Sequence, residues 1–264
     1  MRAPNFLVIG AQKSGTTYLC SYLARHPDVY FSDPKELMFF QRKGLDQKAY
    51  KRYLEKHFSN AQLEKYVGEG STTYLQWPES LNNIKNFLSS ELKIIVCLRH
   101  PVEKAISFYI HNWRKKRYSG HESILEVGKG SITLSPTETS KYADHIQRWL
   151  KAYGKNQVEF LLFDTLVKSN QQFVKQATDF LGISEVECID TKKINAGFPL
   201  EFVNNKLVVA ATPKKGQVVP EFTLADLQLL QMSLSEDISR TEQFIEQNLD
   251  CWKTLPDICT KTVS

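Results

Sequence analysis

The chain opens on Phe6-Leu-Val-Ile-Gly-Ala-Gln-Lys-Ser-Gly-Thr-Thr-Tyr-Leu-Cys20, and this stretch decides the fold. Residues 6–9 are apolar and partly β-branched, which predicts a short buried strand. Residues 10–15 form a loop of small residues with one lysine, and an amphipathic helix is predicted from Thr16 to a point before Pro27. A strand, a glycine loop and a helix in this order aim backbone N–H groups and a helix dipole at one anion.

The position of the lysine separates this loop from the loop of nucleotide-hydrolysing enzymes. Gly10 and Gly15 have the spacing of the motif Gly-x4-Gly-Lys-Ser/Thr, but Thr16 stands where that motif has its lysine. The lysine of this chain lies inside the loop, at Lys13. The loop therefore suits a phosphate without the lysine placement of a kinase or an ATPase. A plain turn, with glycines that serve only close packing, is the alternative.

Two motifs of this sequence resemble those of sulfotransferases that use 3′-phosphoadenosine 5′-phosphosulfate (PAPS). Residues 12–17, Gln-Lys-Ser-Gly-Thr-Thr, are similar to the loop that binds the 5′-phosphosulfate in that family. Residues 97–109 are similar to its 3′-phosphate motif, in which an arginine ends a strand and a serine follows on the next helix; here these are Arg99 and Ser107. The resemblance runs from the N-terminus to about Gly197, and it implies a three-layer, P-loop-like α/β fold with a central parallel sheet flanked by helices.

The rest of the chain alternates strand and helix patterns, which independently predicts a parallel sheet. Further strands are expected at 28–32, 65–69, 93–98 and 158–163, and helices at 47–58, 78–88, from 101 toward 114–117, at 142–153 and at 173–181. Residues 119–139 are expected to form a loop or lid. After Gly197 the sheet pattern fades, and one long helix is expected from about Leu224. We expect a single sulfotransferase domain over residues 1–264.

The resemblance also implies a catalytic base. Residues 33–40, Asp-Pro-Lys-Glu-Leu-Met-Phe-Phe, resemble the Glu-x-His-Phe-Phe run of sulfotransferases that act on glucosaminyl sugars and of their bacterial relatives. Glu36 matches the catalytic glutamate, and Met38 stands where a histidine is common. Glu36 would take the proton of the acceptor, and Lys13 would donate to the bridging oxygen as charge develops there. The alternative is a solvated Lys-Glu pair on a loop.

The donor contacts follow from the same resemblance. The backbone of residues 14–17 and two threonine hydroxyls would hold the 5′-phosphate, and an arginine–serine pair would hold the 3′-phosphate. A late Lys-Lys-Gly turn is similar to the loop that closes over the 3′-phosphate, with an ordinary surface turn as the equal alternative. In the turn after the strand at 65–69, Gly70 replaces a lysine that is frequent in the family. The predicted donor-binding residues are Lys13, Ser14, Gly15, Thr16, Thr17, Arg99, Ser107, Lys214, Lys215 and Gly216.

Composition narrows the class of protein. A hydrophobic fraction of 42%, a charged fraction of 24% and no apolar run of membrane-spanning length predict a soluble globular protein. The net charge of +5 suits a phosphate-rich cofactor or an anionic acceptor, but is below the signature of a nucleic-acid binder. The first strand begins too early for a signal peptide to precede it, so a cytoplasmic protein is expected. Five cysteines without Cys-x-x-Cys spacing predict reduced thiols, and no metal-ligand set stands out.

The sequence thus predicts a PAPS-dependent sulfotransferase that acts on a hydroxyl or an amine of a small-molecule or glycan acceptor. A microbial secondary metabolite fits the absence of a secretion signal as well as a polysaccharide does. No nucleic-acid or membrane partner is expected, and the cations at 114–117 are interpreted as a solvated helix end. Two alternatives remain: a nucleotide kinase or GTPase-like enzyme, and a non-catalytic protein that binds polyanions through residues 114–117.

Overall fold

The computed structural model describes residues 1–188 and 199–259, and the contacts between their α-carbons group them into two compact units. In the described part, the first unit takes residues 1–99 and 147–188, and the second takes residues 100–146 and 199–259. The candidate catalytic residues Lys13 and Glu36 both belong to the first unit.

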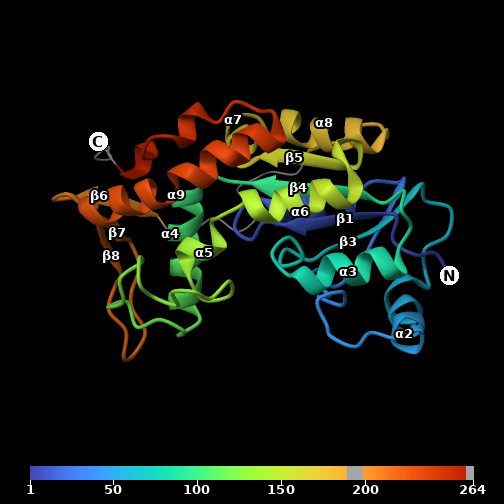
Figure 1. Ribbon diagram of the computed structural model, residues 1–264, viewed down its shortest axis with the longest axis horizontal. Coiled ribbons are helices and arrows are strands. Elements are labelled where there is room, and N and C mark those ends of the chain that lie inside the picture. The colour runs from blue at the N-terminus through green and yellow to red at the C-terminus, as the bar shows by residue number, and fades with distance from the viewer. Residues whose placement is uncertain (189–198, 260–264) are drawn as a thin grey trace. The chain divides into compact units, whose positions relative to one another are not determined.

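The first unit is built on a five-stranded sheet in the order β2-β3-β1-β4-β5 (Figure 1). Every neighbouring pair runs parallel, and β1 lies in the middle, with Val8 in register with Gly70 on one side and Ile95 on the other. The strands are β1 (Phe6–Gly10), β2 (Val29–Phe31), β3 (Tyr66–Gly70), β4 (Lys93–Leu98) and β5 (Val158–Leu162). The predicted parallel sheet is confirmed, and each strand end lies within one residue of its predicted position.

Helices flank this sheet, as the alternating pattern predicted. They are α1 (Thr16–Leu23), α2 (Gln47–Phe58), α3 (Pro78–Phe87), α7 (Phe163–Lys168) and α8 (Asn170–Leu181), while α6 (Ala143–Tyr153) begins in the second unit and ends in the first. On one side, α1 and α8 share a buried core with the strands, to which Tyr18, Leu19 and Phe173 contribute. Cys20 and Cys97 are buried in the first unit.

Helix α7 was not predicted, because a strand was expected to extend to residue 163. The strand instead ends at Leu162, and Phe163 starts a short helix with Asp164 in its first turn. A second helix start follows at once, because the side chain of Ser169 caps α8 by accepting from the N–H of Gln172 at 3.2 Å. Because only Ser169 separates the two helices, the sequence contains no loop segment that would mark the boundary between them.

The second unit contains α4 (Pro101–Arg114), α5 (Pro136–Thr139), α9 (Leu224–Ile245) and an antiparallel sheet in the order β6-β7-β8. The strands are β6 (Leu200–Val203), β7 (Lys206–Val209) and β8 (Glu221–Thr223), so the expectation that the sheet pattern fades after Gly197 was wrong for this segment. Gly197 itself lies outside the described residues. The signal was the Asn204-Asn205 pair, whose φ angles of 48° and 59° make a two-residue hairpin turn.

The C-terminal part of the second unit closes with short turns of 3-10 helix at Asp250–Trp252 and Asp257–Cys259, and a third such turn, Lys155–Gln157, precedes β5 in the first unit. Trp252 is fully buried, so its large side chain anchors this part of the chain in the core.

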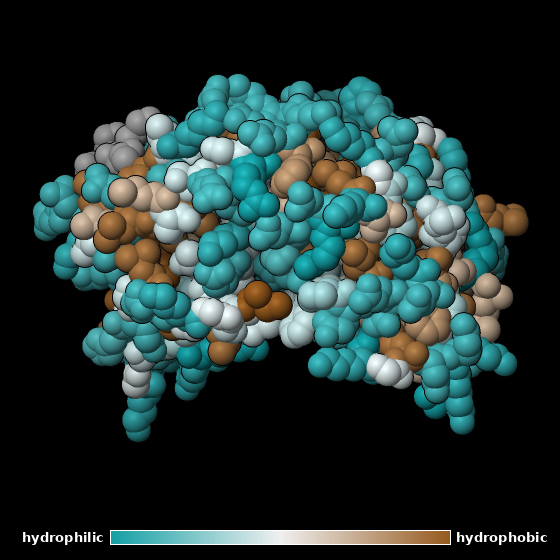
Figure 2. Space-filling view, in the orientation of Figure 1, coloured by the Kyte–Doolittle hydropathy of each residue, from teal (hydrophilic) through white to brown (hydrophobic). Residues whose placement is uncertain are grey.

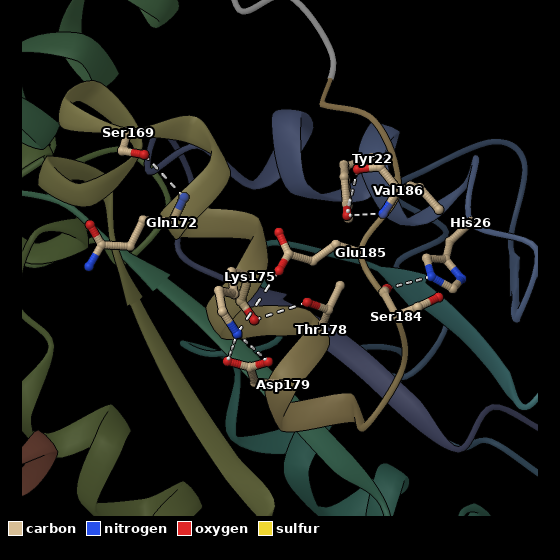
Figure 3. A network of polar contacts seen from close by, with 10 residues as sticks. All are labelled: Tyr22, His26, Ser169, Gln172, Lys175, Thr178, Asp179, Ser184, Glu185 and Val186. Carbon is tan, nitrogen blue, oxygen red and sulfur yellow. Dashed lines mark hydrogen bonds and ion pairs between the residues drawn. The ribbon is translucent and has the colours of Figure 1, made fainter.

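A polar network ties the chain after α8 to the far end of α1 (Figure 3). The hydroxyl of Tyr22 donates to the carbonyl of Val186 at 3.2 Å and accepts from its N–H at 2.9 Å. The Nδ1 atom of His26 accepts from the N–H of Asp28 at 3.0 Å, so its Nε2 atom carries the proton and donates to the carbonyl of Ser184 at 2.8 Å. These bonds fix α1, the helix whose other end borders the glycine loop.

Candidate active site

The loop between β1 and α1 needs both of its glycines. Gly10 and Gly15 have φ angles of 152° and 86°, and Lys13 between them also has a positive φ of 65°. A Cβ atom on Gly10 would lie 2.9 Å from the carbonyl oxygen of Thr72, and one on Gly15 would lie 2.9 Å from Cδ2 of Leu166. The backbone therefore makes a turn here that side chains at either glycine would prevent.

The N-terminus of α1 has no side-chain cap and no acidic residue in its first turn. By contrast, Asp46 caps α2 and Ser169 caps α8. Uncapped N–H groups and the positive end of a helix dipole favour an anion at this point. Ser14 and Thr16 are buried here and Thr17 is half-buried, so the predicted phosphate-binding residues lie together at this helix end.

Glu36 is held rigidly near the carboxyl end of β3. Its backbone, with φ of 68°, donates an N–H bond to the carbonyl of Gly70 at 2.9 Å. The N–H of Thr72 donates to one carboxylate oxygen of Glu36 at 2.9 Å, and the Thr72 hydroxyl lies 3.0 and 3.1 Å from the two oxygens. Three contacts to one residue fix the carboxylate in place, as a proton acceptor requires.

Lys35 joins this carboxylate to the glycine loop. Its Nζ atom lies 2.8 Å from Oε1 of Glu36 and 3.4 Å from Oγ1 of Thr16. The side chains of Lys35 and Glu36 are 23% and 30% exposed, so the pair is only partly open to solvent. No site role was predicted for Lys35 or Thr72, although Lys35 adjoins Glu36 and Thr72 lies in the turn after a predicted strand.

A second carboxyl group lies beneath the site, on β3. Glu69 is fully buried, and burial raises the pKa of its carboxyl from 4.5 to about 8. The hydroxyls of Tyr74 and Tyr53 lower that pKa in part, and the charge of Glu36 raises it further. Glu69 is therefore neutral at pH 7, and it adds no negative charge beside Glu36.

We expect Glu69→Gln to stabilise the protein at high pH. The folded protein keeps the Glu69 proton up to about pH 8, whereas the unfolded chain loses it near 4.5, so Glu69 makes stability fall as pH rises between these values. The variant lacks this loss, and should exceed wild type by on the order of 2–4 kcal/mol at about pH 8, with little difference at about pH 5. Urea unfolding at both pH values measures the effect, and an equal difference at the two would contradict it.

Arg99 follows the last residue of β4 and contacts the same loop. Its guanidinium lies 4.5 Å from the ring centroid of Phe163, and it donates a long hydrogen bond of 3.5 Å to the carbonyl of Lys13. This cation–π contact holds the guanidinium against the start of α7. Phe163 was not predicted as a site residue, because its position becomes apparent only when β5 and β4 are paired.

The remaining predicted donor contacts belong to the second unit. Ser107 lies half-buried on α4, and Lys214, Lys215 and Gly216 form an exposed turn in which Gly216 has a φ of 82°. Lys214 donates to the carbonyl of Arg114, the last residue of α4, at 2.9 Å. Residues 114–117 are exposed at this helix end, as the interpretation of a solvated end predicts. Within the first unit, by contrast, the structure brings the glycine loop, Glu36 and Arg99 to one edge of the sheet.

The sequence pattern of the sulfotransferase domain matches residues 3–194, and the chain belongs to this family. It is similar to human bifunctional heparan sulfate N-deacetylase/N-sulfotransferase 1, with 29% identity over 84% of this chain and 27% of that protein. Mouse heparan sulfate glucosamine 3-O-sulfotransferase 6 is 30% identical over 75% of this chain and 58% of that protein. The chain thus spans about a quarter of the first relative and more than half of the second.

A solved structure supports the same assignment. The crystal structure of a sulfotransferase from Alicyclobacillus acidocaldarius has a TM-score of 0.74 and 25% identity to this chain, and the match covers 96% of this chain and 100% of that one. The predicted P-loop-like α/β fold is confirmed by this match and by the parallel sheet.

Hydrophilic residues predominate on the face in Figure 2, and hydrophobic residues form small separate patches there. Within residues 1–188 and 199–259, no helix combines the length and apolar character needed to cross a bilayer. The same residues contain no group of three or more histidine, cysteine, aspartate or glutamate side chains arranged to hold a metal ion.

Proposed function

We propose that this chain transfers a sulfuryl group from PAPS to a hydroxyl or an amine of a small-molecule or glycan acceptor. The observation that carries the proposal is the pairing of an uncapped, glycine-framed helix end with a rigid carboxylate: both Thr16 and Glu36 contact the ammonium of Lys35. An anion site beside a fixed proton acceptor is the arrangement that group transfer from a phosphosulfate needs. We also propose that residues 1–264 act as one sulfotransferase domain.

The residues of the first unit fit the donor. The N–H groups of residues 14–17 and the hydroxyls of Thr16 and Thr17 would hold its 5′-phosphate, and Arg99 would hold its 3′-phosphate. When bound, PAPS supplies a sulfuryl group on a phosphate that leaves readily as an anion. Contacts of Ser107 and of Lys214–Gly216 with the 3′-phosphate remain predictions from the sequence.

Two residues carry the proposed chemistry. Glu36 accepts the proton of the acceptor while the acceptor oxygen or nitrogen forms its bond to sulfur. Lys13 donates to the bridging oxygen as the bond between that oxygen and sulfur breaks, and so stabilises the charge that develops on the departing phosphate. The products are the sulfated acceptor and 3′-phosphoadenosine 5′-phosphate, and the proton leaves from Glu36 to water.

The acceptor is proposed from the site and from the relatives together. Relatives named for heparan sulfate favour a glycan with glucosaminyl units. Met38, close to Glu36 in the chain, is 39% exposed and donates its backbone N–H to the hydroxyl of Ser71 at 2.9 Å. An exposed thioether at this position favours an acceptor with an apolar part. A screen should therefore include both glucosaminyl oligosaccharides and small apolar alcohols and amines.

The test is calorimetric titration with 3′-phosphoadenosine 5′-phosphate, and separately with ADP and Mg²⁺. We expect metal-independent binding of the first ligand, and about 10- to 100-fold weaker binding in Arg99→Ala, because a charge-assisted hydrogen bond is lost. Arg42→Ala is a matched control, since Arg42 is also stacked on a ring, at 5.6 Å from the centroid of Phe39, but is exposed. Preference for ADP with Mg²⁺ would support the kinase alternative, and binding of polyanions alone would support the non-catalytic one.

A further inference from the structure

Lys35 contacts both the part of the site that would bind the donor and the residue that would take the proton of the acceptor. One of its contacts is the hydroxyl of Thr16, at the helix end that would hold the donor, and the other is the carboxylate of Glu36, which would hold the acceptor. An in-line displacement places the acceptor atom, the sulfur and the leaving oxygen in one row. The sulfuryl group in the middle of that row would therefore lie close to the side chain that contacts both Thr16 and Glu36, which is Lys35.

The neighbouring backbone shows why the Lys35 side chain lies there. The bond from the N–H of Glu36 to the carbonyl of Gly70 places the Lys35 stem beside residue 70. The Lys35 stem packs against this glycine: a Cβ atom at residue 70 would lie 3.5 Å from Cε of Lys35, which is an ordinary contact distance, and 2.7 Å from Sγ of Cys20, which is too close. A side chain at residue 70 would thus clash with Cys20, and the lysine stem lies over the glycine at contact distance.

We propose that Lys35 is a catalytic residue whose ammonium contacts the oxygens of the sulfuryl group during its transfer, in addition to the roles of Lys13 and Glu36. This inference rests on the proposed function. In the structure the ammonium donates to Glu36; with donor bound, its N–H groups also donate to the sulfuryl oxygens. The bond from sulfur to the acceptor forms, the bond from sulfur to the bridging oxygen breaks, the acceptor proton passes to Glu36, and Lys35 stays protonated throughout.

Two acidic groups near Lys35 and Glu36 are uncharged at neutral pH. Burial raises the pKa of the Cys20 thiol to about 12, so this neighbour of Lys35 is neutral. Glu69 is also neutral at pH 7, as described above. Among the described residues of the first unit, Lys35 forms an ion pair with Glu36, and a sulfuryl group would be a second anionic partner.

The experiment compares two ligands that differ only in the sulfuryl group, PAPS and 3′-phosphoadenosine 5′-phosphate. In Lys35→Met we expect the affinity for PAPS to fall about tenfold or more, and that for 3′-phosphoadenosine 5′-phosphate to change by less than about threefold. Release of sulfate from PAPS should slow about 100-fold, and Lys35→Arg should recover part of both effects. Lys51→Met is the matched control, because Lys51 also lies beside a carboxylate, at 3.9 Å from Glu55, on the exposed side of α2.

An unchanged ratio of the two affinities in Lys35→Met would overturn the inference, including the case in which both ligands weaken equally. Circular dichroism shows whether the variant is folded, and Lys35→Gln is measured in the same way if Lys35→Met is not. Failure of wild type to bind either ligand would instead refute the proposed function. Normal binding and turnover in wild type with an unaltered Lys35 variant would refute this inference alone.

Discussion

Replacing Glu36 with glutamine is expected to lower kcat for sulfuryl transfer by about 10²–10⁴-fold, the usual contribution of a general base. Glutamine has nearly the same shape and keeps an oxygen that can accept from the N–H of Thr72, so the fold and the loop should be preserved. Its amide cannot take the proton of the acceptor. The rate is measured in single turnover with the acceptor found in the screen, at saturating PAPS.

Binding separates loss of the base from damage to the site. Glu36→Gln should bind 3′-phosphoadenosine 5′-phosphate within about threefold of wild type, since the proposed role of Glu36 is to contact the acceptor and not the donor. Glu64→Gln is a matched control, because Glu64 also pairs with a cation, Arg2 at 3.8 Å, in the same unit. A rate close to that of wild type in Glu36→Gln would show that Glu36 is not the base. Water or another group would then take the proton of the acceptor.

Replacing Lys13 with methionine is expected to lower kcat by about 10²–10³-fold, because one preorganised donor at a developing charge is lost. Lysine and methionine both carry a Cβ atom, so the backbone strain at the positive φ of 65° is similar for the two residues at position 13. The loop should therefore keep its shape. The measurement is kcat at saturating donor, together with the dissociation constant of 3′-phosphoadenosine 5′-phosphate.

The two quantities assign the role of Lys13. A large fall in kcat with a small change in ligand affinity would show that the lysine stabilises mainly the transition state. A weaker affinity with unchanged kcat at saturation would make Lys13 only a binding residue, and the leaving-group role would be withdrawn. Lys13→Arg should retain more activity than Lys13→Met, because arginine keeps the positive charge. Its activity should stay below that of wild type, because a guanidinium does not reproduce the compact ammonium.

Local patterns were sufficient to predict much of the fold. The apolar run at the start gave β1, and α2 has the predicted bounds Gln47–Phe58 because its periodicity and its capping residue Asp46 agree. The loop residues 13–17 and Arg99 were placed correctly at the sheet edge, since loops after parallel strands gather there.

The contacts that define the candidate site could not be predicted in this way. The bonds from Thr72 to Glu36 join residues 36 positions apart, and the stacking of Arg99 on Phe163 depends on the pairing of β4 with β5. The Lys35 stem lies over Gly70 because β3 and the segment after β2 lie side by side. Such contacts come from tertiary packing, which leaves no periodic signal in the sequence.

The network between Tyr22, His26 and the residues after α8 sets a limit on how far this unit can be shortened. A fragment that ended at Leu181 would still contain the glycine loop, Glu36 and Arg99. It would lack the carbonyl of Ser184 and both backbone groups of Val186, so the buried ring of His26 and the buried hydroxyl end of Tyr22 would lose partners inside the core. A fragment made to test the proposed donor binding therefore has to extend past Val186, even though Arg99, the last residue with a proposed ligand contact in this unit, comes far earlier in the chain.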